Sequence, residues 1–199
     1  MDSNHISFND SHGKTAMIET NVSLSQKLLN MYYYKLSLIL AFLLYSFHSL
    51  SQTIDQRLKE LELTLPEVET PVATYLKWKQ VDNLLYISGT GSDIFGKVGS
   101  DLTVDEGYQA ARSAGLQIIA VLQASTGDLT KINQFVKVLG MVNSDPGFSE
   151  QSMVINGFSD LIVEVFGDKG KHTRSAIGVA ALPNNIAVEI EVIVELKKQ

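Results

Sequence analysis

One stretch of the sequence, residues 170–195, constrains the fold more than any other: GKHTRSAIGVAALPNNIAVEIEVIVE. Side chains alternate in character over 174–179 and again over 187–195, which is the two-residue period of β-strands. The Leu-Pro-Asn-Asn sequence at 182–185 favours a turn, because proline cannot donate to a strand ladder and asparagine tolerates turn dihedral angles. The pattern predicts an antiparallel hairpin with one core face and one outer face.

The alternation also predicts which side chains lie on the outer face of this hairpin. Arg174 falls on the outer face of the first strand, where the small neighbours Ala176 and Gly178 leave space above it. Glu189 and Glu191 fall on the outer face of the second strand, and the pattern does not choose between them. An ordinary solvated face would show the same alternation, so both interpretations stay open. The core face of the second strand is expected to carry Val188, Ile190, Val192 and Val194.

Composition excludes several classes of function. The net charge of −6 argues against a protein that binds nucleic acid through a basic face. Because the chain has no cysteine, it has no disulfides, zinc–thiolate sites or thiol chemistry. The histidines, at positions 5, 12, 48 and 172, do not cluster along the sequence, so we expect no metal site and no cofactor.

The N-terminal region has the features of an export signal. Residues 1–30 are polar without sustained periodicity, which predicts no regular structure. The apolar run that follows, 36–47, is too short to span a bilayer comfortably but suits a signal peptide, with Lys35 as its positive flank. Small residues at the end of this region allow cleavage before Gln52. We therefore expect a periplasmic or secreted protein.

Two alternatives for this region stay open. The apolar run would anchor the protein in a membrane if it were not cleaved. Translation could also begin at Met31 instead of Met1, which would remove the polar stretch. In each case the sequence divides into an N-terminal part, 1–51, and a single domain, 52–199, which is long enough to bury one core.

Within the domain, periodicity and capping signals predict a short helix and then the order β-β-α-β-α-β-β. A capping box opens the first long helix at Thr103 and Glu106, and Gly127 closes it. The expected elements are a helix at 54–61, strands at 73–80 and 84–89, a helix at 104–126, a strand at 132–142, a helix at 151–166, and the two strands of the hairpin. This order predicts an α+β fold, with a mixed sheet covered on one face by two helices.

Several motifs resemble the Rid/YjgF family of reactive-intermediate imine deaminases, also called endoribonuclease L-PSP, and its chorismate-mutase-like branch in particular. They are DLTVDEGYQAAR at 101–112, VNSDPGF at 142–148, VINGFSDL at 154–161, and RSAIGVAALP at 174–183 followed by VEIE. The resemblance spans 54–198. It implies the chorismate-mutase-like fold and a homotrimer with pockets between its subunits.

The resemblance also implies roles for particular residues. Arg174 matches the arginine that holds a substrate carboxylate, a task that suits its planar fork. Glu189 matches the glutamate that positions water at the imine carbon. Two positions depart from the deaminases, with Ala176 in place of a frequent cysteine and Thr90 in place of glutamine. The remaining residues that match the pocket are Tyr75, Ser88, Gly89 and Asn156.

The expected activity is hydrolysis of 2-imino or enamine acids to 2-keto acids and ammonia. The predicted hairpin would place Glu189 opposite Gly178, roughly 13 Å from Arg174 along the strand, so a site shared between subunits is expected. One alternative is a metabolite-binding module of the same fold without catalysis. The other is an endoribonuclease, against which the acidic composition argues.

Overall fold

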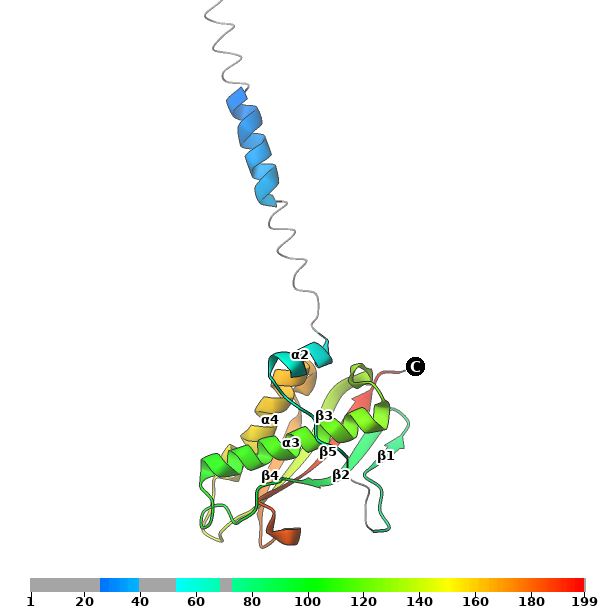
Figure 1. The fold of residues 1–199 in the computed structure, drawn as a ribbon, viewed down its shortest axis with the longest axis vertical. Coiled ribbons are helices and arrows are strands. Elements are labelled where there is room, and N and C mark those ends of the chain that lie inside the picture. The colour runs from blue at the N-terminus through cyan, green and yellow to red at the C-terminus, as the bar shows by residue number, and fades with distance from the viewer. Residues whose placement is uncertain (1–25, 40–52, 69–72, 199) are drawn as a thin grey trace, which may run out of the picture. The chain divides into compact units, whose positions relative to one another are not determined.

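The computed structural model describes residues 26–39, 53–68 and 73–198 (Figure 1). The chain divides into two units, Met1–Ser51 and Gln52–Gln199. In the first unit a helix with exposed side chains spans 26–39, so it begins inside the polar stretch that we expected to be irregular. No helix in the described ranges has the length and hydrophobicity needed to cross a bilayer. The end of the apolar run and the expected cleavage site before Gln52 lie outside the described residues.

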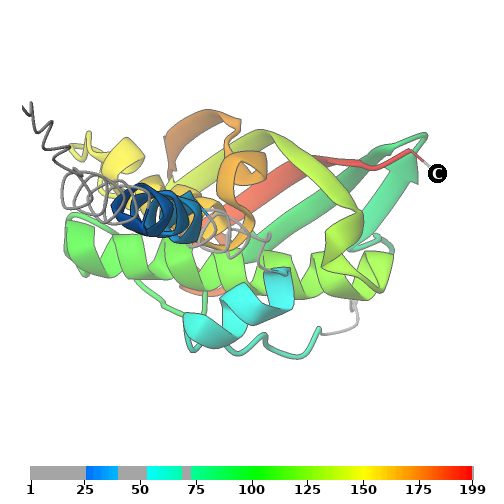
Figure 2. The same cartoon turned by 90° about the horizontal axis from the view of Figure 1, so that it is seen from above.

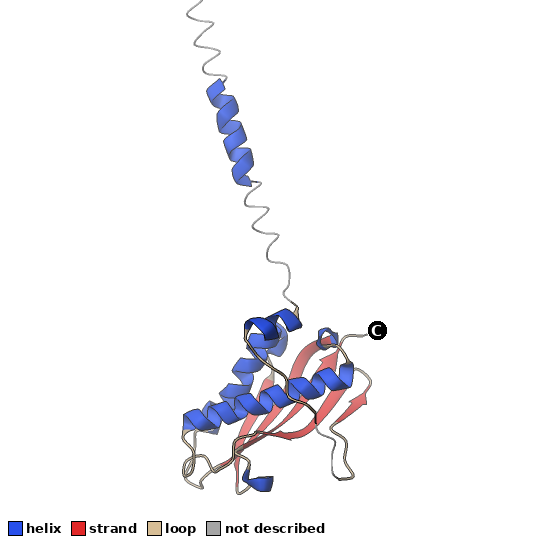
Figure 3. Cartoon of the chain, in the orientation of Figure 1, coloured by secondary structure: helices blue, strands red, loops and turns tan. Residues whose placement is uncertain are grey.

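The second unit is built on a five-stranded mixed sheet with the order β1-β2-β5-β3-β4. β3 and β4 are parallel, and the other neighbouring strands are antiparallel. The helices α3 and α4 lie across one face of the sheet (Figures 1 and 3). The strands are β1 (Trp78–Val81), β2 (Leu84–Gly91), β3 (Ile132–Asn143), β4 (Thr173–Val179) and β5 (Val188–Leu196). This arrangement confirms the predicted α+β fold.

The helices follow their predicted boundaries because local chemistry sets their ends. Thr103 caps α3 (Val104–Thr126) in a capping box with Glu106, and Gly127 ends it at a φ of 69°. α4 (Gln151–Phe166) ends at Gly167, which has a φ of 61°. The short helix α2 (Ile54–Glu60) packs against the helix layer and contributes Leu58 to the core (Figure 2).

The hydrophobic core lies between the sheet and the two long helices. The four valine and isoleucine side chains predicted to line the core face of β5 are at most 2% exposed. Side chains of β3 and α4, such as Val138 and Ile155, meet them there. The opposite face of the sheet has no helix over it among the described residues of this unit.

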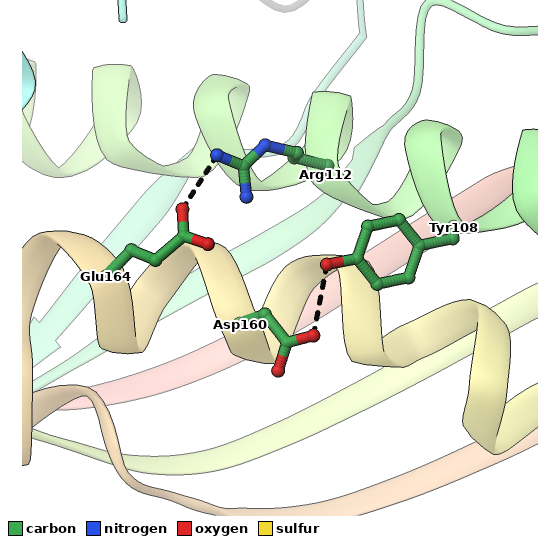
Figure 4. A network of polar contacts seen from close by, with 4 residues as sticks. All are labelled: Tyr108, Arg112, Asp160 and Glu164. Carbon is green, nitrogen blue, oxygen red and sulfur yellow. Dashed lines mark hydrogen bonds and ion pairs between the residues drawn. The ribbon is translucent and has the colours of Figure 1, made fainter. Parts of the chain in front are cut away.

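α3 and α4 cross at very close range, and Gly157 makes this possible. A Cβ atom at Gly157 would collide with the backbone carbonyl of Tyr108. Two polar contacts flank the crossing (Figure 4): Tyr108 Oη donates to Asp160 at 3.0 Å, and Arg112 pairs with Glu164 at 2.7 Å. Burial, and then the hydrogen bond to Asp160, raise the pKa of Tyr108.

The predicted hairpin between the last two strands is wrong. β4 pairs with β3 in parallel, as the edge strand of the sheet, whereas β5 runs between β2 and β3. The loop between them, with the 3-10 turn η3 (Pro183–Asn185), therefore carries the chain past β3 to a position between two strands. The first strand was also predicted too early, at 73–80, since β1 begins at Trp78.

Candidate functional site

Arg174 lies on the helix-covered side of β4 and reaches the polar side of α4. It pairs in register with the buried Val138, so both side chains point to the same face. Its Nη1 donates to Asn156 Oδ1 and to Ser159 Oγ, both at 2.9 Å, and its Nη2 donates to the Ser152 carbonyl at 3.3 Å. The structure therefore unites two predicted site residues, Arg174 and Asn156.

These contacts leave one edge of the Arg174 guanidinium available. The group carries five N–H donors in a fixed plane. The contacts with α4 use both hydrogens of Nη1 and one of Nη2. No described residue supplies an acceptor for the Nε–H, and Nη2, which shares an edge of the guanidinium with Nε, has a second hydrogen to donate. Such an edge matches the two oxygens of a carboxylate.

The position of Arg174 corrects the sequence analysis, which placed it on the outer face with Glu189. Ala176 and Gly178 share its face, and Ala176 packs against the core while Gly178 abuts Ser144 and Gln151. The small residues therefore accommodate the start of α4 and not a space above an open sheet. β4 is the edge strand of the sheet, so a long side chain on its core face can extend past the core. The polar tip of Arg174 then meets the polar side of α4.

Two residues of this site were missed in the sequence: Ser159 and His172. Ser159 Oγ lies 3.1 Å from His172 Nε2, and His172 Nδ1 lies 2.6 Å from the Gly170 carbonyl. Burial lowers the pKa of His172, the hydrogen bond to Gly170 opposes this effect in part, and the charge of Arg174 lowers the pKa further. A signal was present, because His172 stands directly before β4 and two residues before Arg174, a spacing that puts both side chains on one side of extended chain.

Glu189 lies on the open face of the sheet, in the same row as Met141 and Gly91. A register shift in β2 between Ile87 and Thr90 brings Gly89 against the Glu189 carboxylate, where a Cβ at Gly89 would collide with Oε1. Burial, and then the charge of Glu191, raise the pKa of Glu189. Glu189 is therefore better suited than an ordinary exposed glutamate to exchange a proton near neutral pH.

Gly89→Ala is expected to displace the Glu189 carboxylate while leaving the fold intact, because the colliding atom is the end of a flexible side chain. The pKa of Glu189 should then move back toward its ordinary value as the carboxyl becomes solvated. Carboxyl-selective NMR titration of wild type and variant would measure this change. An unchanged Glu189 titration in a folded Gly89→Ala variant would contradict the close packing of these two residues.

Ser88 and Tyr75 lie near each other without joining Arg174. Ser88 Oγ donates to the Leu76 carbonyl at 2.6 Å, which fixes the segment before β1. Tyr75 precedes that strand and is 48% exposed. A shallow groove of about 260 Å³ follows the open face here, lined by Leu76, Tyr86, Ser88, Lys137, Leu139 and Glu191 among others.

The predicted site residues thus form two groups on opposite faces of the sheet. Arg174 and Asn156 lie on the helix-covered face, and Glu189 with Gly89 lies on the open face. The register puts Arg174 three residues and two strands away from Glu189, or roughly 14 Å between their Cα atoms. One subunit therefore does not bring the two charged groups together. No cluster of acidic or histidine side chains in the described residues is arranged to hold a metal ion.

Comparisons with known proteins agree with this fold. The family described as "YjgF/chorismate_mutase-like, putative endoribonuclease" matches residues 55–196. Protein TCP17 of Trypanosoma cruzi is 41% identical over 73% of this chain and 96% of its own length. The crystal structure of a putative endoribonuclease from Shewanella oneidensis MR-1 is 32% identical, with a TM-score of 0.71 over 73% of this chain and all of that one. A 2-iminobutanoate/2-iminopropanoate deaminase of Dermatophagoides farinae is 27% identical over 68% of this chain and 95% of its own length. The chain therefore belongs to the YjgF/chorismate mutase-like, putative endoribonuclease family.

Proposed function

We propose that this protein binds a small carboxylated metabolite through Arg174, in a pocket completed by a neighbouring subunit, and hydrolyses 2-imino or enamine acids. The observation that carries the proposal is the guanidinium edge of Arg174, which is held from behind by Asn156 and Ser159. A donor pair fixed in this way selects a carboxylate by both charge and shape. The name of the deaminase relative from D. farinae supports the choice of substrate class.

The proposed reaction needs one further group, which Glu189 provides. Water adds to the carbon of the C=N bond, the nitrogen takes up protons, and it leaves as ammonia with a 2-keto acid as the second product. A carboxyl group of raised pKa can accept the proton of the attacking water and return it to the departing nitrogen. The proposed site needs no metal or cofactor.

A homotrimer is part of this proposal, because Arg174 and Glu189 lie on opposite faces of one sheet. Apolar side chains on the open face, Tyr86 and Ile177, are 41% and 43% exposed in the single chain. A neighbouring subunit that covers the open face would bury these two side chains and could bring its own side chains beside Glu189. Light scattering should give three times the mass of one chain. A monomer at micromolar concentration would contradict the shared pocket.

Arg174→Lys is expected to weaken binding of a 2-keto acid such as 2-ketobutyrate, while the fold and the assembly are kept. A lysine offers a point charge in place of the fork, and loss of one charge-assisted hydrogen bond costs about 1.5–3 kcal/mol. This corresponds to roughly 10- to 150-fold in affinity. Calorimetric titration measures it, and equal affinity in both proteins would return Arg174 to a structural role.

A binding module without catalysis is the second candidate, favoured by the separation of Arg174 and Glu189 within one chain. Timed release of keto acid from a freshly generated 2-imino acid distinguishes the two. A separate incubation with RNA, in which cleavage of the RNA is measured, tests the endoribonuclease activity named for the S. oneidensis relative. The net charge of −6 counts against RNA binding.

Export is also proposed, with a mature protein that begins near Gln52. The support is the apolar run 36–47 behind Lys35 and the small residues that follow it. Intact-mass measurement on the protein from its native host tests the proposal. A full-length chain in the membrane fraction would favour the anchor instead.

A further inference from the structure

His172 forms the end of a hydrogen-bond chain whose direction follows from its distances. Its Nδ1 lies 2.6 Å from the Gly170 carbonyl oxygen, which can only accept, so Nδ1 carries the hydrogen. In a neutral ring Nε2 is then an acceptor, and the hydroxyl of Ser159, at 3.1 Å, is its donor. The Ser159 oxygen in turn accepts from Arg174 Nη1 at 2.9 Å.

The surroundings of His172 favour the neutral form of the ring, which this hydrogen-bond chain requires. The ring is partly buried and packs against Phe158 in an edge-to-face arrangement, with 5.8 Å between the ring centroids. Burial lowers the pKa of His172 and outweighs the hydrogen bond to Gly170, which raises it, while the neighbouring guanidinium lowers the pKa further. In the adjoining turn, Asp168 and Lys171 pair with each other at 2.7 Å, and Lys169 donates to the Ile132 carbonyl at 3.4 Å. From α4, Asp160 and Glu164 engage Tyr108 and Arg112 of α3.

We propose that neutral His172 is a positioning residue for the carboxylate site: its Nε2 accepts a hydrogen bond from the Ser159 hydroxyl, which directs the oxygen lone pairs toward Arg174 and holds the guanidinium with its Nε–H free. This inference rests on the proposed function for its effect on ligand binding. Without the acceptor at Nε2, the hydroxyl can rotate and turn its lone pairs away from Arg174 Nη1. Asn156 then remains as the single fixed partner of Nη1.

Two variants separate the acceptor role from a general packing role. In His172→Gln the side-chain carbonyl can reach the place of Nε2 and still accept from Ser159. In His172→Asn the amide can still donate to Gly170, but the acceptor is lost. Because His172→Gln retains the hydrogen bond, we expect its affinity for 2-ketobutyrate to stay within about 2-fold of wild type. The affinity of His172→Asn should be about 3- to 10-fold weaker. Equal losses in both variants would overturn the proposal.

Ser159→Ala should weaken binding by about as much as His172→Asn, and the double variant should be no weaker than either single variant, since both changes break one chain. Additive losses would contradict this. The matched control is Ser125→Ala, because Ser125 Oγ donates to the Leu122 carbonyl inside α3. The affinity of Ser125→Ala for 2-ketobutyrate should equal that of wild type.

A spectroscopic test needs no ligand. In the full chain with ¹⁵N label, the histidine signals that disappear in His172→Gln belong to His172. They should show a protonated Nδ1 and an unprotonated Nε2 at neutral pH. The opposite tautomer, or a charged ring, would overturn the positioning role. If wild type bound no 2-keto acid, the proposed function would fail, and the tautomer would still decide the direction of the chain.

Discussion

Gly157→Ala is expected to destabilise the domain by about 3 kcal/mol or more, which is the upper range for overpacking. The added methyl group would collide with the backbone carbonyl of Tyr108, and a main-chain atom in the middle of α3 cannot rotate away. The helices would have to separate, which would loosen the packing of Phe158 and Leu161 against Gly115. For a domain of this size the melting temperature should fall by roughly 10 °C.

The matched control is Gly147→Ala, because a Cβ at Gly147 would meet no atom within 4 Å. Its stability should stay within about 1 kcal/mol of wild type. Chemical denaturation of the three proteins measures the difference. Equal stability of Gly157→Ala and Gly147→Ala would mean that α3 and α4 do not approach as closely as the structure has them.

The polar contacts beside this crossing contribute little to the stability of the helix pair. Arg112 and Glu164 have side chains that are 24% and 40% exposed, and ion pairs of this kind contribute about 0–1 kcal/mol. Close approach of the two helices therefore depends on the missing side chain at Gly157 more than on the charges around it. Backbone contact between helices also explains why the motif at 154–161 has glycine on a buried face.

Local signals predicted the helices well, and the same signals could not predict strand pairing. Thr103, Glu106 and Gly127 fix the ends of α3 through contacts within a few residues. The alternation over 174–179 and 187–195 likewise predicted two strands. It did not predict their partners, because a strand pattern is the same whichever strand lies beside it. The order strand–helix–strand from β3 to β4 was the better guide, since a helical crossover joins parallel neighbours.

The candidate site was predicted as a set of residues but not as an arrangement. The face assigned to Arg174 was wrong because polarity was taken to mean exposure, whereas Arg174 finds its partners on α4. Ser159 was missed because a serine on a helix has no distinctive pattern, and His172 was missed because its two-residue spacing from Arg174 was not used. Their role appears only when the crossover brings α4 over β4.

Glu189→Gln is expected to reduce imine hydrolysis by at least about 100-fold, as loss of a general acid–base group does. Affinity for 2-ketobutyrate should stay near that of wild type, because Arg174 holds the carboxylate. Glu191→Gln is the matched control, since Glu191 lies on the same face two residues away and should leave hydrolysis within a few-fold. Equal losses in both variants would mean that the negative charge of the face matters, and not a particular carboxyl.

Stability gives an independent measure of the same carboxyl group. Burial and Glu191 raise the pKa of Glu189 in the folded chain above its ordinary value of 4.5. The folded state therefore holds this proton more tightly than the unfolded state, so the contribution of Glu189 to stability is largest below its ordinary pKa and is lost as the pH rises through the raised one. Glu189→Gln carries no charge to bury, so it should be more stable than wild type at neutral pH. The difference should shrink toward zero in acid, as denaturation at pH values on both sides of this window would measure. If Glu189→Gln were less stable than wild type at neutral pH, the charged Glu189 carboxylate would have a stabilising partner in the folded chain. The raised pKa proposed for catalysis would then be contradicted.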